Sequence, residues 1–391
     1  MKDKHTTFSF AYRILLLISV GVAILGQLAR ISFSNNLGFL YLDIIVLFFS
    51  LFTLAIADRK WMKEIAKKRI LCYLIIFYSV IAFSLAGWAV LYGNLPIVGI
   101  MYALRFFTYS SLVISFSYGL EKHIVSRAEM EKAVLLISIG IAILGIIQYV
   151  FIPDVRFLSL MGWDDHYYRL VSTLFDPPFT GAVIGIGLLL LQSKRNKKPL
   201  SVVSWIVMFI AFMLTYSRAS YICYLIASGI QSLQIKTKIW FVGLLILTIF
   251  SMVLLPRPAS EGTRLERTQS IVARKETLVS SLRSISIKTL LVGNGWYMTS
   301  GGLMNTALPY IPSRASASDN SYLHVLESTG LFGLVVFCLL LVTMLKSVKN
   351  NYWVLPSYIF LGIGALANNL LFYPHIMFLI WMMYAVSQAK E

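Results

Sequence analysis

Residues 179–220 read FTGAVIGIGLLLLQSKRNKKPLSVVSWIVMFIAFMLTYSRAS and hold two apolar runs separated by a lysine-rich loop. The runs cover 179–193 and 200–217, and the second ends in a turn that carries one arginine, Arg218. A membrane-spanning helix needs about 20 predominantly apolar residues. Because apolar runs and basic loops alternate in both directions from this stretch, the pattern predicts a helical protein that crosses a membrane many times.

The basic residues differ from one loop to the next. One set of loops is rich in lysine, at Lys60, Lys63, Lys67, Lys68, Lys194, Lys197, Lys198, Lys346 and Lys349. The alternate loops carry mainly arginine, at Arg156, Arg169, Arg218, Arg257, Arg264, Arg267, Arg274, Arg283 and Arg314. Excess positive charge on short loops marks the cytoplasmic side, so the lysine loops and both termini are expected there. Arginine on the outer side indicates anion binding, because a guanidinium holds carboxylate or phosphate with two parallel hydrogen bonds.

The composition fits a membrane protein and argues against several soluble classes. Of the 391 residues, 58% are hydrophobic and 13% are charged, whereas soluble proteins have about 25% charged residues. A net charge of +17 would suggest nucleic acid as the partner of a soluble chain, but membrane topology and anionic lipid explain it here. The cysteines lie inside apolar runs, which argues against a disulfide framework or a thiolate metal site.

The hydropathy pattern predicts one all-α membrane domain over residues 1–391, with about twelve transmembrane helices. The expected spans are 14–29, 37–57, 70–92, 95–120, 133–152, 179–193, 200–217, 219–233, 239–256, 321–345, 352–372 and 374–388. Spans six, eight and twelve are the shortest, and each is short enough to be re-entrant.

Two outer loops, 153–178 and 257–320, are long enough to be functional. The second loop joins spans nine and ten. It predicts a periplasmic helix along the membrane surface, because apolar residues share one helical face at Ile271, Leu278, Leu282 and Ile285. An exposed connector with a solvated charged face is the alternative.

Three outer arginines are candidates for holding a diphosphate: Arg169, Arg218 and Arg274. Arg218 lies in Thr215-Tyr-Ser-Arg-Ala-Ser220, where Ser217 and its neighbours add hydroxyl groups. A diphosphate needs several fixed cations and hydroxyl donors, and this set supplies both. The alternative is that the arginines reach lipid phosphates at the outer interface and anchor the protein.

Asp319-Asn320 is followed after nine residues by Gly330-Leu-Phe-Gly333, where the large loop re-enters the membrane. Asp319 is a candidate general base, since a carboxylate beside arginines can accept a proton from a hydroxyl group. The structural alternative makes Ser318 or Asp319 the N-cap of span ten. It makes the two glycines sites of close helix packing.

Asp176 and two prolines in Thr173–Gly181 predict a broken span entrance that lines a cavity. An ordinary helix start with proline in its first turn is the alternative. Arg105 and Asp43 lie at similar depth within their spans and are expected to form a structural ion pair. The histidines show no metal-ligand spacing, and no phosphate-binding glycine loop supports nucleotide hydrolysis, so neither a metal nor a cofactor is expected.

These segments together resemble the bacterial O-antigen ligase and O-antigen polymerase superfamily. The ligase signature is a histidine, then Asn, Ser or Gln, nine residues and Gly-x-x-Gly, which Asp319-Asn320-x9-Gly330-x-x-Gly333 fits except at its first position. The further similarities lie over about 150–345, in Arg274-Lys-Glu-Thr-Leu278, Thr215-Tyr-Ser-Arg218, Asp176-Pro-Pro178 and Val292-Gly-Asn-Gly295. The replacement of the ligase histidine by Asp319 favours the polymerase branch.

The resemblance implies a polymerase in the bacterial inner membrane that joins two undecaprenyl-diphosphate-linked oligosaccharides without a metal. Arg169, Arg218 and Arg274 would hold diphosphate, and Asp319 would deprotonate or orient the attacking hydroxyl. Ser217, Asp176 and Asn320 would contact substrate, and a chain-length regulator is an expected membrane partner. Two alternatives stay open: a ligase that transfers the glycan to lipid A core, and a transporter of organic anions built from broken helices.

Overall fold

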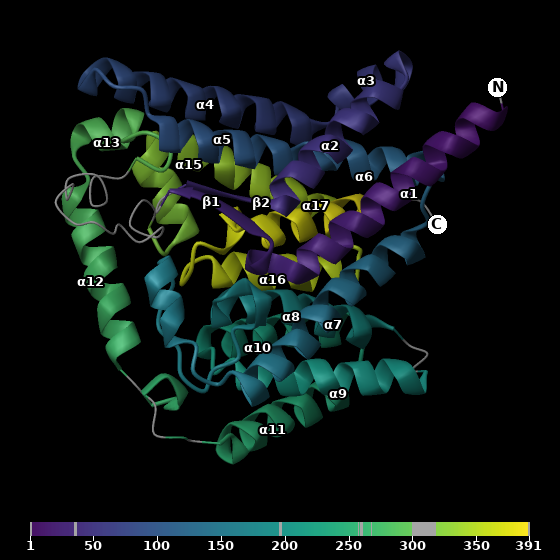
Figure 1. The fold of residues 1–391 in the computed structure, drawn as a ribbon, viewed down its shortest axis with the longest axis vertical. Helices are drawn as coiled ribbons and strands as arrows, with labels where there is room; N and C mark the ends of the chain where they lie inside the picture. Colours follow the sequence, from purple (N-terminus) through teal and green to yellow (C-terminus); the bar gives the residue numbers. More distant parts are fainter. Residues whose placement is uncertain are drawn as a thin grey trace.

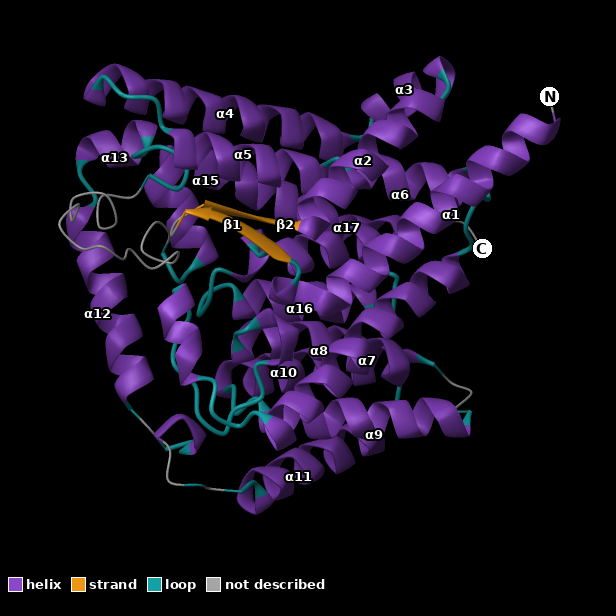
Figure 2. Ribbon diagram, in the orientation of Figure 1, coloured by secondary structure: helices purple, strands orange, loops and turns teal. Residues whose placement is uncertain are grey.

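The computed structural model describes residues 2–34, 37–194, 198–256, 258, 261–266, 268–298 and 318–389. Within these ranges the chain is mostly helical, with one short hairpin as its sheet (Figure 2). The main helices are α1 Lys2–Leu25, α2 Tyr41–Ile56, α3 Arg59–Ala66, α4 Arg69–Tyr92, α5 Ile97–Ser110, α6 Leu112–Glu121, α7 Arg127–Phe151, α8 Pro177–Ser193, α9 Pro199–Leu214, α10 Arg218–Gln234, α11 Lys238–Leu254, α12 Gln269–Ser284, α13 Ile287–Val292, α15 Ser321–Val348, α16 Val354–Gly364 and α17 Pro374–Gln388. Short 3-10 turns connect them at Gly26–Leu28, Arg156–Met161, Ser172–Leu174, Glu261–Thr263 and Leu370–Phe372.

Each of the twelve predicted apolar runs contains at least one helix, so the expectation of a helical protein with several membrane-compatible helices is confirmed. Five segments of the described chain are long and apolar enough to cross a membrane: Thr7–Leu28, Arg69–Tyr92, Ile97–Glu121, Arg127–Phe151 and Ser321–Val348. The pair α2 and α3, bent by 117°, would make a sixth. Four more apolar helices, α8, α9, α11 and α16, have 10–17 residues. The number of crossings therefore stays a prediction.

Helices α8 and α17 form the interior of the bundle. Nearly all of their residues are buried, whereas α9 and α11 expose many of their large apolar side chains. A helix that is apolar on every side belongs in the interior of a large protein or a membrane bundle. Spans six and twelve, predicted at 179–193 and 374–388, correspond to these two helices. These two short spans are therefore helices that other helices surround on all sides.

Figure 1 shows most helices running in roughly the same direction, with α12 crossing one end of the bundle at a steep angle. Both termini and α3 lie at the opposite end. α12 is the helix predicted within 257–320, and its Leu278 and Leu282 are exposed. Its placement on a membrane surface stays a prediction. Three arginines of the same loop lie outside the described residues: Arg257, Arg267 and Arg314.

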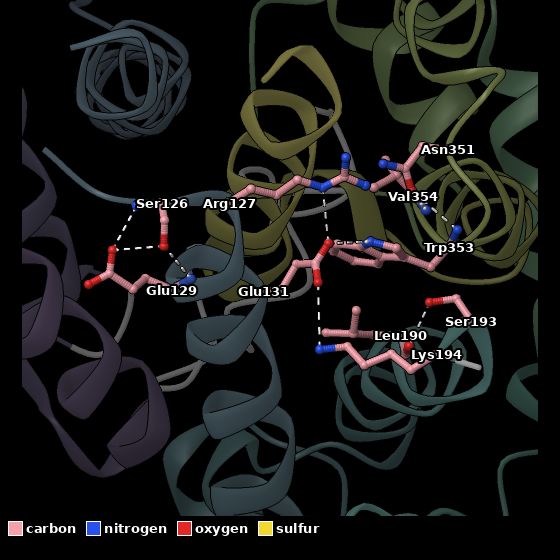
Figure 3. Close-up of polar contacts among 10 residues, drawn as sticks. All are labelled: Ser126, Arg127, Glu129, Glu131, Leu190, Ser193, Lys194, Asn351, Trp353 and Val354. Carbon is pink, nitrogen blue, oxygen red and sulfur yellow. Dashed lines mark hydrogen bonds and ion pairs between the residues drawn. The ribbon is translucent and has the colours of Figure 1, made fainter. Parts of the chain in front are cut away.

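Glu131 of α7 joins the starts of α7 and α16 to the residue that follows α8 (Figure 3). One carboxylate oxygen accepts from Arg127 Nε at 3.2 Å and from Trp353 Nε1 at 3.3 Å. The other lies 3.6 Å from Lys194 Nζ. The lysine-rich loop after α8 is thereby tied to the starts of α7 and α16.

Helix α15 is broken at Gly330, whose φ of 73° and ψ of −174° lie outside helical values. In a continuous helix Tyr322 and Phe337 would be separated by about 22 Å along the axis, at 1.5 Å per residue. Their ring centroids are 6.4 Å apart. The run predicted as one span at 321–345 is therefore a short half-helix, Ser321–Thr329, followed by a sharp bend and a longer helix.

The backbone groups freed by this bend are bound by the glycine-rich segment that follows α13. The carbonyl of Glu327 accepts from Asn294 N at 2.8 Å, and that of Ser328 accepts from Gly295 N at 3.1 Å. The Ser328 carbonyl also accepts from the hydroxyl of Ser84 on α4. Polar backbone at membrane depth is tolerated only where such partners exist. The segment 292–295, quoted for the resemblance, thus binds the last turn of the half-helix before Gly330.

The departure from an all-helical fold is an antiparallel hairpin of β1, Arg30–Ser34, and β2, Leu37–Leu40. Arg30 pairs with Leu40, and Ser32 pairs with Gly38. Span two was predicted to begin at 37, but 37–40 form β2 and the helix begins at Tyr41. The carboxylate of Asp43 accepts from Leu40 N at 3.0 Å and stabilises this helix start.

Gly330→Ala tests the break. The backbone conformation at Gly330 is essentially restricted to glycine, and an added Cβ would lie 2.8 Å from the carbonyl oxygen of Leu290. We expect the variant to unfold more easily by about 1–3 kcal/mol, measured by thermal unfolding in detergent. Gly362→Ala in α16 is the control, because its added Cβ would meet nothing closer than 3.5 Å. Equal stability of both variants would show that α15 does not need the break.

Candidate functional site

A cavity lies where the hairpin, α5, and the starts of α8 and α15 meet the connection between α16 and α17. Its volume is about 140 Å³, and one water needs about 10–15 Å³ on this scale. Four charged side chains line it: Arg30, Arg105, Asp176 and Asp319. The structure thus brings together two predicted site residues, Asp176 and Asp319, from distant parts of the sequence.

Arg105 forms the predicted ion pair with Asp43. Its Nε and Nη2 donate to Asp43 Oδ2 at 3.1 and 2.7 Å, and Nη2 also donates to the carbonyl of Gly38 at 2.8 Å. The hydroxyl of Tyr109 donates to Asp43 Oδ1 at 2.9 Å. A partly buried charge pair is tolerated when its remaining hydrogen-bonding groups are satisfied in this way. The pair fixes α2, α5 and the hairpin to one another at the wall of the cavity.

Asn320, rather than Ser318 or Asp319, caps the half-helix of α15. Its Oδ1 accepts from the backbone of Tyr322 at 2.9 Å and of Leu323 at 3.1 Å. Its Nδ2 donates to the carbonyl of Leu366 at 3.0 Å. The structural alternative for Asp319 as a cap is therefore wrong, and its exposed side chain faces the cavity instead. The amide of Asn320 already makes three hydrogen bonds, and its contact with substrate stays a prediction.

Asp176 ends the loop before α8, which begins at Pro177 with proline in its first turn. This is the ordinary helix start considered as the alternative for Thr173–Gly181. The segment was also predicted to line a cavity, and Asp176 is buried and does line it. A second carboxylate therefore faces the same space as Asp319.

Two of the predicted arginines are associated with the turn 215–218, which joins α9 to α10. Arg169 is buried, and its Nε donates to the carbonyl of Thr215 at 3.2 Å. Arg218 begins α10 three residues later, and its Nη1 donates to the carbonyl of Leu265 at 2.9 Å. Ser217, between them, is buried and accepts a hydrogen bond from the Ser220 hydroxyl at 2.8 Å. The turn therefore orients the guanidinium of Arg169, and Leu265 orients that of Arg218, while Ser217 does not line the cavity.

Arg274 links this turn to the cavity. Its Nη2 donates to Asn368 Oδ1 at 3.2 Å, and Asn368 lines the cavity. Its positive charge also acts on Arg218. We name Arg169, Arg218 and Arg274 the arginine patch. Two arginines whose like charges act on one another, one of them bonded to the cavity wall through Asn368, favour an anionic ligand that would offset their repulsion.

The sequence did not reveal the aromatic walls of the cavity or Arg30. Tyr102 and Tyr297 stack with ring centroids 3.9 Å apart, and Phe179 and Tyr373 stack at 4.0 Å. All four line the cavity. Flat rings beside carboxylates and amides suit a ligand with apolar faces and hydroxyl edges, such as a sugar. Arg30 is a single charged residue between two apolar runs. That isolated charge was the sequence signal that could have identified it as a site residue.

Arg156 behaves differently from the arginine patch. It is exposed, and its Nε and Nη2 donate to Asp154 at 2.9 and 2.7 Å. This pairing lowers the pKa of Asp154 to about 2. Because Arg156 is bound by Asp154 and does not line the cavity, it is a suitable control arginine.

No protein-family model matches the chain, and no curated protein matches it. The function must therefore be argued from the residues that the fold brings together.

The cap assignment gives a stability test that separates two adjacent residues. Asn320→Ala removes both cap hydrogen bonds and should cost about 0.5–2 kcal/mol. Asp319→Asn should leave stability almost unchanged, because Asp319 makes no cap bond. Thermal unfolding of the purified variants in detergent measures both. A loss in Asp319→Asn as large as that in Asn320→Ala would restore Asp319 as a structural residue.

Proposed function

We propose that this chain is a bacterial inner-membrane polymerase that joins lipid-linked oligosaccharide repeat units at the outer face of the membrane. The observation that carries the proposal is the arrangement of the resembling segments. Asp319 and Asp176 line one cavity, and Asn368 of that cavity accepts a hydrogen bond from Arg274 of the arginine patch. The segments are distant in the sequence, and packing alone does not require their functional groups to meet.

The proposed reaction transfers a glycan between two undecaprenyl-diphosphate-linked oligosaccharides. An acceptor sugar hydroxyl attacks the anomeric carbon of the donor and forms the new glycosidic C–O bond. The C–O bond to diphosphate breaks, and polyprenyl diphosphate leaves with the electron pair. The carboxylate of Asp319 takes the hydroxyl proton. The arginine patch stabilises the charge that develops on the leaving diphosphate, which therefore needs no proton.

The two alternatives fit less well. A ligase for lipid A core would share the donor chemistry, but the family ligases use a histidine where this chain has Asp319. A transporter of organic anions would use Arg105 as its intramembrane cation. Asp43 already offsets the charge of Arg105, so Arg105 is a poor binding site for a transported anion.

We infer about twelve spans with both termini in the cytoplasm. Six spans come from the five long candidates and α2, and the others are α8, α9, α10, α11, α16 and α17. Figure 1 supports the orientation, because both termini lie at one end of the bundle and α12 with the arginine-rich loop lies at the other. Substrates on undecaprenyl diphosphate, with a chain-length regulator as partner, would then meet the cavity from the outer face.

Lysine substitutions in the arginine patch test diphosphate binding. Arg218→Lys and Arg274→Lys keep the charge but lose the two-pronged geometry. We expect each to shorten the glycan ladder strongly, with polymerisation lowered about tenfold or more, while the protein inserts normally. Arg156→Lys is the matched control, and its ladder should be unchanged. Long ladders from both patch variants at normal expression would make these arginines lipid anchors.

Asp319→Asn tests the proton acceptor with little change in shape. An amide cannot accept the proton at working pH, so the chemical step should fall roughly 100-fold or more. Gel analysis of the glycans should then show only very short chains at a normal protein level. Asp319→His should retain part of the activity, because imidazole is a competent base near neutral pH. A ladder of ordinary length from Asp319→Asn would remove Asp319 from the mechanism.

A further inference from the structure

The hairpin brings a further cation, Arg30, to the cavity. Arg30 is not part of the arginine patch. Arg30 is the first residue of β1, and its side chain lines the cavity together with Asp176 and Asp319. Its Nε is shielded from solvent and has no hydrogen-bond partner among the described residues. A shielded donor without an acceptor is costly in a folded protein. Because this donor is unsatisfied within the protein, the guanidinium that lines the cavity is a candidate for binding a ligand acceptor.

Gly38 on the neighbouring strand makes room for this guanidinium. A Cβ at Gly38 would lie 2.8 Å from Nη2 and 3.0 Å from Cζ of Arg30, and closer still to Nε. The register pairs Arg30 with Leu40 and Ser32 with Gly38, so Arg30 reaches diagonally across the hairpin onto residue 38. Any side chain at residue 38 would displace the guanidinium from the cavity wall.

Gly38 also holds the second arginine of the cavity. Its carbonyl accepts from Arg105 Nη2 at 2.8 Å, and Asp43 offsets the charge of Arg105 at 2.7 Å. None of the ion pairs between described residues includes Arg30. The two arginines therefore differ: Arg105 holds the hairpin in place, and Arg30 presents a charge to the cavity.

We propose that Arg30 forms an anion subsite that binds an oxyanion, phosphate or carboxylate, of the acceptor glycan-lipid. The proposal rests on the polymerase function. A polymerase takes two lipid-linked units, and the arginine patch accounts for the diphosphate of only one of them. An oxyanion held by the fork of Arg30 would place the acceptor in the cavity that Asp319 lines. The anion comes either from the lipid diphosphate or from an acidic sugar.

Chemical labelling tests the subsite without relying on polymerisation. The full-length protein in lipid nanodiscs is treated with phenylglyoxal, which modifies arginine, and peptide mass spectrometry follows Arg30 and Arg156. Inorganic diphosphate or glucuronate is added, with sodium chloride at matched ionic strength as the reference. We expect one of these anions to slow the modification of Arg30 several-fold and to leave Arg156 unchanged. Protection by diphosphate indicates the lipid head group, and protection by glucuronate indicates an acidic sugar.

Gly38→Ala provides an independent variant, because it keeps the charge of Arg30 and moves its guanidinium. Anion protection of Arg30 should disappear in Gly38→Ala, provided that the variant elutes as a single folded species. Arg30→Lys covers the case in which Gly38→Ala does not fold. In a reaction with purified lipid-linked units, Arg30→Lys should raise the acceptor KM about tenfold with little change in kcat. Asp319→Asn should instead lower kcat.

The outcomes separate the subsite from the proposed function. If neither anion protects Arg30, or if Arg156 is protected equally, the subsite is wrong. An unchanged acceptor KM in Arg30→Lys would also overturn it, even if glycans lengthen normally. If Arg30 is protected and Gly38→Ala removes the protection, but no glycan lengthens, the subsite stands and the polymerase function fails.

Discussion

The fold around the cavity depends on the break of α15 at Gly330. The break is possible because the carbonyls of Glu327 and Ser328 accept from Asn294 and Gly295 instead of from later turns of the same helix. It ends a half-helix whose start, capped by Asn320, brings Asp319 to the cavity. A continuous helix over the same residues would carry Tyr322 far from Phe337. The bend thus places the start of the half-helix, and with it Asp319, at the cavity.

Charge is used in two distinct ways near the cavity. Arg105 and Asp43 neutralise one another and hold the hairpin against α5, which is a structural role. The positive charge of Arg274 instead acts on Arg218, and Arg274 Nη2 donates to the neutral amide oxygen of Asn368 at the cavity. Repulsion between like charges lowers the stability of the folded protein. A bound anion would offset that repulsion. This contrast is the physical basis for assigning the anion to the outer arginines.

The sequence predicted the helices well because apolar length is a local property. The pairing of Arg105 with Asp43 was also predictable, since two opposite charges within spans have few other partners. The break at Gly330 was not predictable. A glycine within an apolar helical run can mark either a close helix contact or a break in the helix, and the sequence does not distinguish the two. The N-cap was predicted at Ser318 or Asp319 and is Asn320 instead, because all three residue types suit that position. The hairpin was hidden because residues 37–40 are apolar and merge with α2 in hydropathy.

We propose that the cavity and the arginine patch serve one transfer reaction. The most direct test is to reconstitute the purified chain in liposomes with lipid-linked repeat units extracted from the producing cells. The released polyprenyl diphosphate and the glycan length are then measured together. The account predicts longer glycans, with one polyprenyl diphosphate released for each unit added. Release only when lipid A core is supplied, or movement of the units across the bilayer without lengthening, would contradict it.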